Sequence, residues 1–294
     1  MSARGFSLLE AVVALGIGTS VAVAGLVLTA DLQRFQHRHA QALAARRDVR
    51  GAVRLISQDV RNAGVGAGYR PDGRFAGLLA GRFSVPGGAV FAAEGRPVET
   101  PDGQLVVDDL GVRRALGSRR TILYLEEGTG EICAGLDLRA DQLLIASSRS
   151  GRAARTLRVT SATDGICTRG QCVGGCTRLG WTPDATYLSH PGAVSAGFTA
   201  GDLFTEFETV VWFVARGEDG RAQLRRVGAR TADACAAPDA TCGALVAEGI
   251  ELLQYRVSAF DPSTRAWEAV SLAAEIATPR RLRVDLELVA RGRS

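Results

Sequence analysis

The sequence predicts an α+β protein in which a long N-terminal α-helix is packed on a β-rich, disulfide-bonded head. Three observations lead to this prediction. Residues 11–30 carry no formal charge, a helical spacing of apolar side chains continues to about residue 60, and strand-like alternation with six cysteines occupies the rest. About 230 residues remain after the helix, enough for one large or two small domains.

The uncharged run is long enough to cross a membrane. At about 1.5 Å per residue, a helix over residues 11–30 reaches about 30 Å, so a span over residues 10–30 is expected. Glu10 lies at its N-terminal edge, where an unpaired carboxylate costs on the order of a few kcal/mol. A cut between Gly5 and Phe6 would place an α-ammonium four residues before Glu10, within reach of this carboxylate or of that of a neighbouring copy.

Beyond residue 30 the helix is predicted to become amphipathic rather than to stop. One face carries Leu32, Phe35, His39, Ala42, Arg46, Val49, Val53, Ile56 and Val60. Since His39 and Arg46 interrupt this stripe, we expect the turns from Val49 to Val60 to pack on the head. The glycine-rich residues 62–68 should end the helix, which gives a helix over residues 6–63 and a head over 64–294.

The head is predicted to be β-rich. Glycine and proline make residues 64–102 a long loop region, with one short strand near 89–92, and residues 217–220 are predicted to form a hairpin connection. The Cys/Gly-rich segment 167–201 has little periodicity and is expected to be an insertion pinned by disulfides. The remaining strands are predicted at 104–107, 121–125, 142–147, 155–160, 208–215, 222–227, 250–260 and 281–289.

The six cysteines, an even number, all lie beyond residue 130: Cys133, Cys167, Cys172, Cys176, Cys235 and Cys242. In an exported chain this indicates disulfides. A zinc site is the alternative, but no C-x-x-C pair is present, so we expect no metal and no cofactor. Sequence does not fix the pairing; short loops favour Cys172 with Cys176 and Cys235 with Cys242, which leaves Cys133 with Cys167.

The N-terminus resembles a known export signal. Gly5-Phe6-Ser7-Leu8-Leu9-Glu10 after a short basic leader is similar to the class III signal of type IV pilins and type II secretion pseudopilins. The resemblance implies that a prepilin peptidase removes residues 1–5, that Phe6 is N-methylated, and that Glu10 docks to a neighbouring subunit. It also implies a pilin-like lollipop fold. Unlike many members, the apolar segment has glycines but no proline.

Two further stretches narrow the resemblance. Residues 55–64, Leu-Ile-Ser-Gln-Asp-Val-Arg-Asn-Ala-Gly, resemble the end of the long helix in PilW-like minor pilins. Residues 248–257, Trp267 and residues 281–288 are similar to the C-terminal strands of that family and of the related J-type pseudopilins. Together with the N-terminus, these matches cover about a third of the chain.

The family resemblance implies a structural role in pilus assembly. Such a minor pilin belongs to the complex that initiates the filament and sits at its tip, and it supports motility and adhesion. Its expected partners are other minor and major pilins, prepilin peptidase and a tip adhesin. It resides in the bacterial inner membrane with a periplasmic head before it enters the pilus at the cell surface. A J-type pseudopilin of a type II secretion system is the rival within the same superfamily.

Other interpretations of the N-terminus remain open. An ordinary signal peptide would be cut after Ala22-Val23-Ala24, and a plain membrane anchor would show the same apolar run. Since only Arg4 precedes the span and several arginines follow it, the positive-inside rule alone would put the head in the cytoplasm. The signal motif and the cysteines favour export instead. A buried core helix rarely lacks charge over so many residues.

Composition gives little support for catalysis or nucleic-acid binding. The three histidines are His37, His39 and His190, and the first two lie on the long helix. Adjacent acids such as Glu126 and Glu127 would point to opposite faces of a strand, so they cannot act as a pair. With a net charge of +4 and arginine pairs interrupted by acids, we expect neither an enzyme nor a nucleic-acid-binding protein. An exported or membrane-anchored enzyme with a β-rich domain is the rival from another class.

Overall fold

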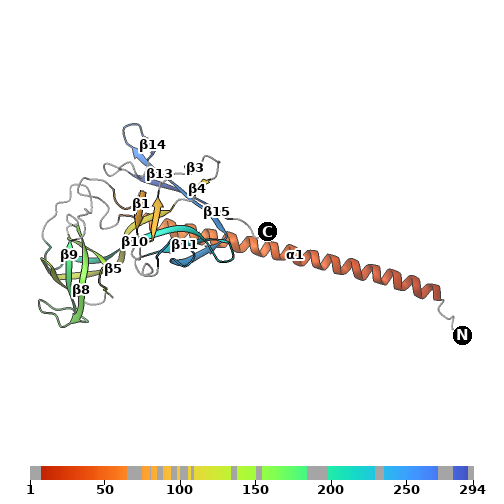
Figure 1. The fold of residues 1–294 in the computed structure, drawn as a ribbon, viewed down its shortest axis with the longest axis horizontal. Coiled ribbons are helices and arrows are strands. Elements are labelled where there is room, and N and C mark those ends of the chain that lie inside the picture. The colour runs from red at the N-terminus through yellow and green to blue at the C-terminus, as the bar shows by residue number, and fades with distance from the viewer. Residues whose placement is uncertain are drawn as a thin grey trace. The chain divides into compact units, whose positions relative to one another are not determined.

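The computed structural model describes residues 8–64, 75–79, 81–84, 89–93, 98–99, 105–106, 109–133, 138–149, 154–183, 198–228, 235–270 and 281–290. The chain divides into two compact units, Met1–Arg47 with Gly292–Ser294 and Asp48–Arg291. One long N-terminal helix comes first, and a β-rich domain follows it in the chain (Figure 1). This domain contains disulfides. The predicted order of the elements is therefore confirmed at this level.

Helix α1, Leu8–Arg61, contains 54 residues, or about 81 Å of helix. Its apolar residues in the first unit are exposed, as Leu15 at 73% and Leu26 at 71% show. In the described part of the chain, α1 is the one helix long and apolar enough to cross a membrane, although a signal sequence would satisfy the same criterion.

The part of α1 in the second unit is amphipathic. Ala52, Ile56 and Asp59 are buried, while Val49 and Val60 are partly buried against the same core. The prediction that residues 49–60 pack on the head is thus confirmed, except that Val53 is 38% exposed and Ala52 lies in the core instead. The helix ends two residues before the predicted boundary. Gly64 adopts a φ of 74°, and its N–H donates to the carbonyl of Arg113, 2.8 Å away.

The main sheet contains a closed ring of strands. Pairing runs in the order β10, β5, β6, β9, β8, β7 and back to β10, which makes a six-stranded antiparallel barrel. Their bounds are β5 Leu110–Glu126, β6 Thr129–Cys133, β7 Leu143–Ser147, β8 Ala154–Gly165, β9 Cys176–Pro183 and β10 Leu203–Arg216. A barrel this narrow is filled by side chains. Its interior holds Ile122, Ile132, Leu144, Ala146, Leu157, Val159, Leu179, Trp181 and Phe204.

Two of these strands are long enough to leave the barrel and form a second, open sheet. Beyond a register shift between Thr205 and Phe207, β10 and β5 continue as a pair and are joined by β11, Ala222–Val227, and β12, Ala244–Glu248. At this shift Arg119 and Ala115 of β5 oppose Thr205 and Phe207, so β5 holds extra residues that bend the sheet. The predicted hairpin connects β10 to β11, with the Gly217 N–H donating to Arg221.

Both faces of the open sheet are covered. One face, including Leu110, Trp212 and Leu224, shares a core with the end of α1. The other face, including Phe213 and Val227, packs on β2, Val90–Ala93, and on the loop closed by Cys235 and Cys242. This double cover explains why β10 is buried almost without alternation.

The C-terminal strands form a separate sheet, shown in blue in Figure 1. Its order is β14, Ala266–Ala269, then β13, Ile250–Asp261, then β15, Leu282–Ala290. Along β15, Leu282, Val284, Leu286 and Leu288 are partly buried and the charged residues between them are exposed, so the predicted alternation is confirmed. Two short pairs complete the described strands: β1, Gly81–Ser84, with β2, and β3, Val98–Glu99, with β4, Leu105–Val106.

Several strands differ from the prediction. Strand β9 occupies residues 176–183 inside the segment expected to be an insertion. The prediction also lacks β6, β12 and β14, and the expected loop region 64–102 contains β1 and β3 besides the one predicted strand. The predicted strand 121–125 is only the barrel half of β5, whose first half contains glycines and arginines that hid its strand character. Residues 184–197 of the expected insertion lie outside the described part of the chain.

Candidate functional site

The processing site at the N-terminus lies outside the described residues, because Gly5 and Phe6 precede Leu8. Glu10 lies within α1, and its side chain is outside the described part. These three assignments therefore stay predictions. The structure does describe two other polar centres. One is a group of charged residues around Asp59, called here the joint, where the end of α1 contacts the open sheet. The other is the disulfide-bonded loop between β8 and β9, which contains Cys167 and Cys172.

The joint is centred on Asp59, which is 4% exposed in the last turn of α1. Its Oδ2 accepts hydrogen bonds from the indole N–H of Trp212, at 3.0 Å, and from Nε of Arg226, at 2.9 Å. Its Oδ1 pairs with Arg114. Since Trp212, Arg226 and Arg114 come from β10, β11 and β5, one helical carboxylate binds three neighbouring strands.

A second carboxylate completes this joint. Glu208 of β10 is 5% exposed, and its Oε1 accepts bonds from Nε and Nη2 of Arg114, at 2.9 and 2.7 Å. Arg226 Nη2 lies 3.5 Å from the same oxygen. Two carboxylates and two guanidiniums therefore neutralise each other in a mostly buried setting, where an unpaired charge would be costly. The joint is an anchor for α1, a role that sequence reasoning missed for Asp59.

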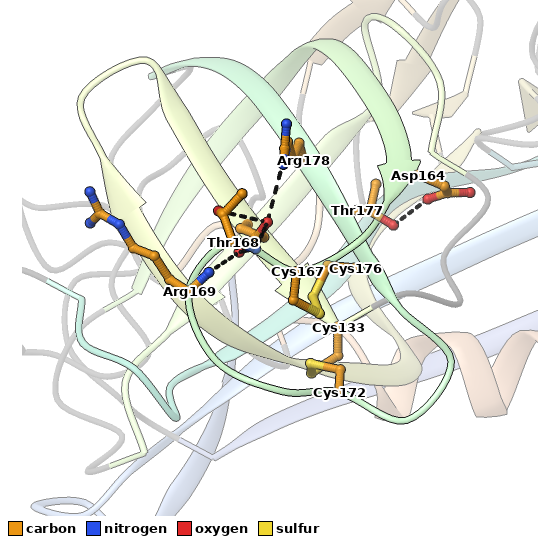
Figure 2. The surroundings of a disulfide bond; sticks show 10 residues. Cys133, Asp164, Cys167, Thr168, Arg169, Cys172, Cys176, Thr177 and Arg178 are labelled. Carbon is orange, nitrogen blue, oxygen red and sulfur yellow. Dashed lines mark hydrogen bonds and ion pairs between the residues drawn. A yellow bond between two sulfur atoms is a disulfide. The ribbon is translucent and has the colours of Figure 1, made fainter.

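The disulfide-bonded loop lies between β8 and β9. Cys133 of β6 pairs with Cys172, Cys167 pairs with Cys176 of β9, and Cys235 pairs with Cys242 (Figure 2 shows the first two bonds). Only the third pair agrees with the pairing that loop length favoured, and the other two expectations are wrong.

The strand pairing explains this difference. Cys133 and Cys176 are register partners on neighbouring strands, and Gly165, two residues before Cys167, also opposes Cys176. The hairpin therefore brings Cys167 to Cys176, and the returning loop brings Cys172 to Cys133. Loop length alone does not contain this information.

The buried carboxylate of Glu131 also binds this disulfide-bonded loop. Glu131 of β6 is fully buried and accepts hydrogen bonds from the backbone N–H groups of Thr168 and Arg169, each at 3.0 Å, and from the Thr168 hydroxyl at 3.1 Å. Arg178 Nε lies 3.6 Å from it. Burial raises the pKa of Glu131, but the bonds from Thr168 and Arg169 together outweigh burial and lower the pKa below the ordinary 4.5. The carboxylate is thus charged at neutral pH and fixes the loop.

Among the described residues, no catalytic arrangement forms around the acids Glu126 and Glu127 that were considered from the sequence. His190 lies outside the described part, and Glu126 and Glu127 are exposed on the turn side of β5. Glu126 instead pairs with Arg169, whose guanidinium also lies 4.5 Å from the ring centre of Tyr124. These contacts fasten the outside of the disulfide-bonded loop to β5.

Comparison with models of known protein families, with curated proteins and with solved structures finds no match to this chain.

Proposed function

We propose that this chain is a PilW-like minor pilin, a non-enzymatic subunit of a type IV pilus that belongs to the assembly-initiating or tip complex. The observation that carries the proposal is the combination of the Gly5-Phe6-Ser7-Leu8-Leu9-Glu10 signal with a single helix, Leu8–Arg61, that continues from the apolar run to the core of a β-rich domain. A cleaved secretory signal would not need this continuity.

In this proposal, α1 serves two purposes. Its apolar part holds the subunit in the inner membrane and then packs with other pilins, because its exposed side chains need an apolar environment in either place. Its last turns fix the head through Asp59 and the apolar contacts around Ile56. Cleavage after Gly5, methylation of Phe6 and docking through Glu10 complete the assembly mechanism.

Processing provides the first test. Intact-mass measurement of the membrane-extracted protein should give a terminus at N-methylated Phe6. Gly5→Ala or a bulkier substitution should leave residues 1–5 attached, because Gly5 is the residue before the proposed cut. Gly16→Ala is the matched control, since a methyl group there would have no atom within 4 Å apart from its own stretch of helix backbone. A terminus shortly after Ala24 would overturn the proposal in favour of a signal peptide.

Assembly provides the second test. Glu10→Gln should preserve insertion and head folding, because it removes a charge that is costly in the membrane, but should lower co-purification with the other pilins and the number of surface pili. Mass spectrometry of purified pili should detect the wild-type chain as a minor component. Normal piliation by Glu10→Gln would remove the docking role, and recovery of the chain with a type II secretion complex in place of pili would favour the J-type pseudopilin.

A further inference from the structure

Four of the six cysteines meet at one place, although they are spread over residues 133–176. Cys133 ends β6, Cys176 begins β9, and Cys167 and Cys172 come from the loop between β8 and β9. The Sγ atoms of Cys167, Cys172 and Cys176 all lie within 4.8 Å of one another, and Cys133 is bonded to Cys172. Figure 2 shows the two disulfides side by side. Their sulfurs therefore form one cluster rather than two separate crosslinks.

This cluster has nearly the spacing of a four-thiolate metal site. Zinc binds four cysteine thiolates as a tetrahedron with bonds of about 2.3 Å, which places neighbouring sulfurs about 3.8 Å apart. Three of the sulfurs are already within 4.8 Å. Cys133 is not one of these three, but its bond to Cys172 keeps its sulfur next to the group. After the two S–S bonds open, the bonded partners must separate by about 2 Å and Cys133 must move toward Cys167 and Cys176 to complete a tetrahedron.

The loop has a second support that does not depend on its disulfides. Glu131 accepts three hydrogen bonds from Thr168 and Arg169, immediately after Cys167. The turn from Cys172 to Gly175 is closed by a backbone hydrogen bond. None of these hydrogen bonds involves a cysteine sulfur, so opening the S–S bonds does not itself remove them. Cys167 and Cys172 are partly exposed, which gives a metal ion access, whereas Cys176 is buried.

We infer that Cys133, Cys167, Cys172 and Cys176 form a tetrathiolate site for Zn²⁺ or a similar soft divalent metal when both disulfides are reduced. A thiol reductant supplies two electrons per disulfide and leaves as its own disulfide, which gives four cysteine thiols. Binding of one Zn²⁺ then releases four protons and forms four Zn–S bonds. Metal and disulfides are therefore alternative states of the same four side chains, one for a reducing and one for an oxidising compartment.

The third disulfide offers an internal control. Cys235 and Cys242 are both fully buried, and among the described residues they belong to no group of three or more potential metal ligands. Their reduction yields two thiols with no third ligand among the described residues, so they should not hold zinc tightly. The inference does not rest on the pilin proposal, because it uses only the barrel and its loop.

The test uses the full chain in detergent, and a water-soluble phosphine reduces it under an oxygen-free atmosphere. For each disulfide that is reduced, one phosphine takes the oxygen atom of one water molecule and becomes a phosphine oxide. Zn²⁺ is then added, unbound metal is removed, and bound zinc is measured by elemental analysis. Co²⁺ replaces Zn²⁺ in a parallel sample, where thiolate-to-cobalt absorption reports the ligands. We expect one metal per reduced chain, none per oxidised chain, and tetrahedral four-thiolate cobalt absorption.

Variants separate a built site from incidental thiols. Cys172→Ser should weaken zinc affinity at least about tenfold, whereas the double variant Cys235→Ser/Cys242→Ser should bind one zinc as the wild type does. The same titration in urea shows whether the fold is needed, and we expect weaker binding there. Less than about one tenth of an equivalent in the reduced chain, equal affinity in urea, or loss of binding in the Cys235→Ser/Cys242→Ser variant would each overturn the inference.

Discussion

Replacement of Asp59 by asparagine should strongly destabilise the second unit. In the wild type, Asp59 and Glu208 balance Arg114 and Arg226, so the described joint carries no net charge. The substitution leaves two guanidiniums with one carboxylate, and the joint becomes positive by one charge. The side chains of Arg114 and Arg226 are 14% and 26% exposed, so water compensates for the missing charge only in part.

The magnitude follows from the contacts that are lost or weakened. Removal of one partner from a buried ion pair costs about 3–5 kcal/mol. The asparagine carbonyl can still accept one hydrogen bond, for example from Trp212, which preserves about 1 kcal/mol. We therefore expect Asp59→Asn to lower the free energy of unfolding by about 3 kcal/mol.

Urea denaturation of the full chain in detergent measures this loss, with tryptophan fluorescence as the signal because Trp212 lies in the joint. Asp48→Asn is the matched control, since Asp48 is an exposed acid of the same helix and its loss should change stability by less than about 0.5 kcal/mol. A double-mutant cycle with Arg226→Gln should show coupling of at least about 1 kcal/mol. A loss below about 1 kcal/mol for Asp59→Asn, or no coupling to Arg226, would refute the role of Asp59 as an anchor.

Two further predictions concern the barrel loop and the disulfides. Glu131→Gln should lower the free energy of unfolding by about 2 kcal/mol at pH 7, because an amide accepts fewer of the loop's hydrogen bonds. The folded-state pKa of Glu131 lies below 4.5, so the difference in free energy of unfolding between the wild type and Glu131→Gln should be complete above pH 4.5. This difference should shrink as the pH falls through the folded pKa, which urea denaturation of both proteins at pH 7 and pH 3 would show. Peptide mapping without reductant should recover the three disulfides. Double serine substitution of Cys133 and Cys172, which are 39 residues apart, should lower the free energy of unfolding by about 4 kcal/mol. The same substitution of Cys235 and Cys242, which are 7 residues apart, should lower it by about 2 kcal/mol. Equal losses would contradict the argument that a disulfide closing a longer loop stabilises more.

The elements that could be predicted from sequence are those with a regular local pattern. The long helix, the alternation of β15 and the β10–β11 hairpin all follow from side-chain spacing and turn residues within one segment. Strand β9 could not be recognised, because glycine, cysteine and threonine replace the aliphatic side chains that mark most strands, and its neighbours β6 and β8 supply the burial.

The polar centres depend on contacts between distant segments, so sequence alone could not reveal them. Asp59 meets Trp212 and Arg226 across more than 150 residues, and no local pattern distinguishes it from an exposed acid at a helix end. Cys133 is 39 residues from Cys172, and their pairing follows from strand neighbours that are visible only in the fold. The sequence shows only an acid a few residues before a glycine that ends the helix, and its burial is visible only in the fold.

Strands β5 and β10 run without a break from the joint around Asp59 into the barrel. Strand β5 carries Arg114 at the joint and Ile122 in the barrel, and β10 carries Trp212 at the joint and Phe204 in the barrel. A force applied to the last turns of α1 is therefore transmitted through the continuous backbone of β5 and β10 into the closed barrel. It does not have to cross a non-covalent contact between separate layers after the joint. The ion cluster fixes one end of these strands, while the barrel at the other end is closed by hydrogen bonds and stapled by two disulfides. This arrangement suits a subunit whose helix and head must remain together under load, as the proposed role in a pilus requires.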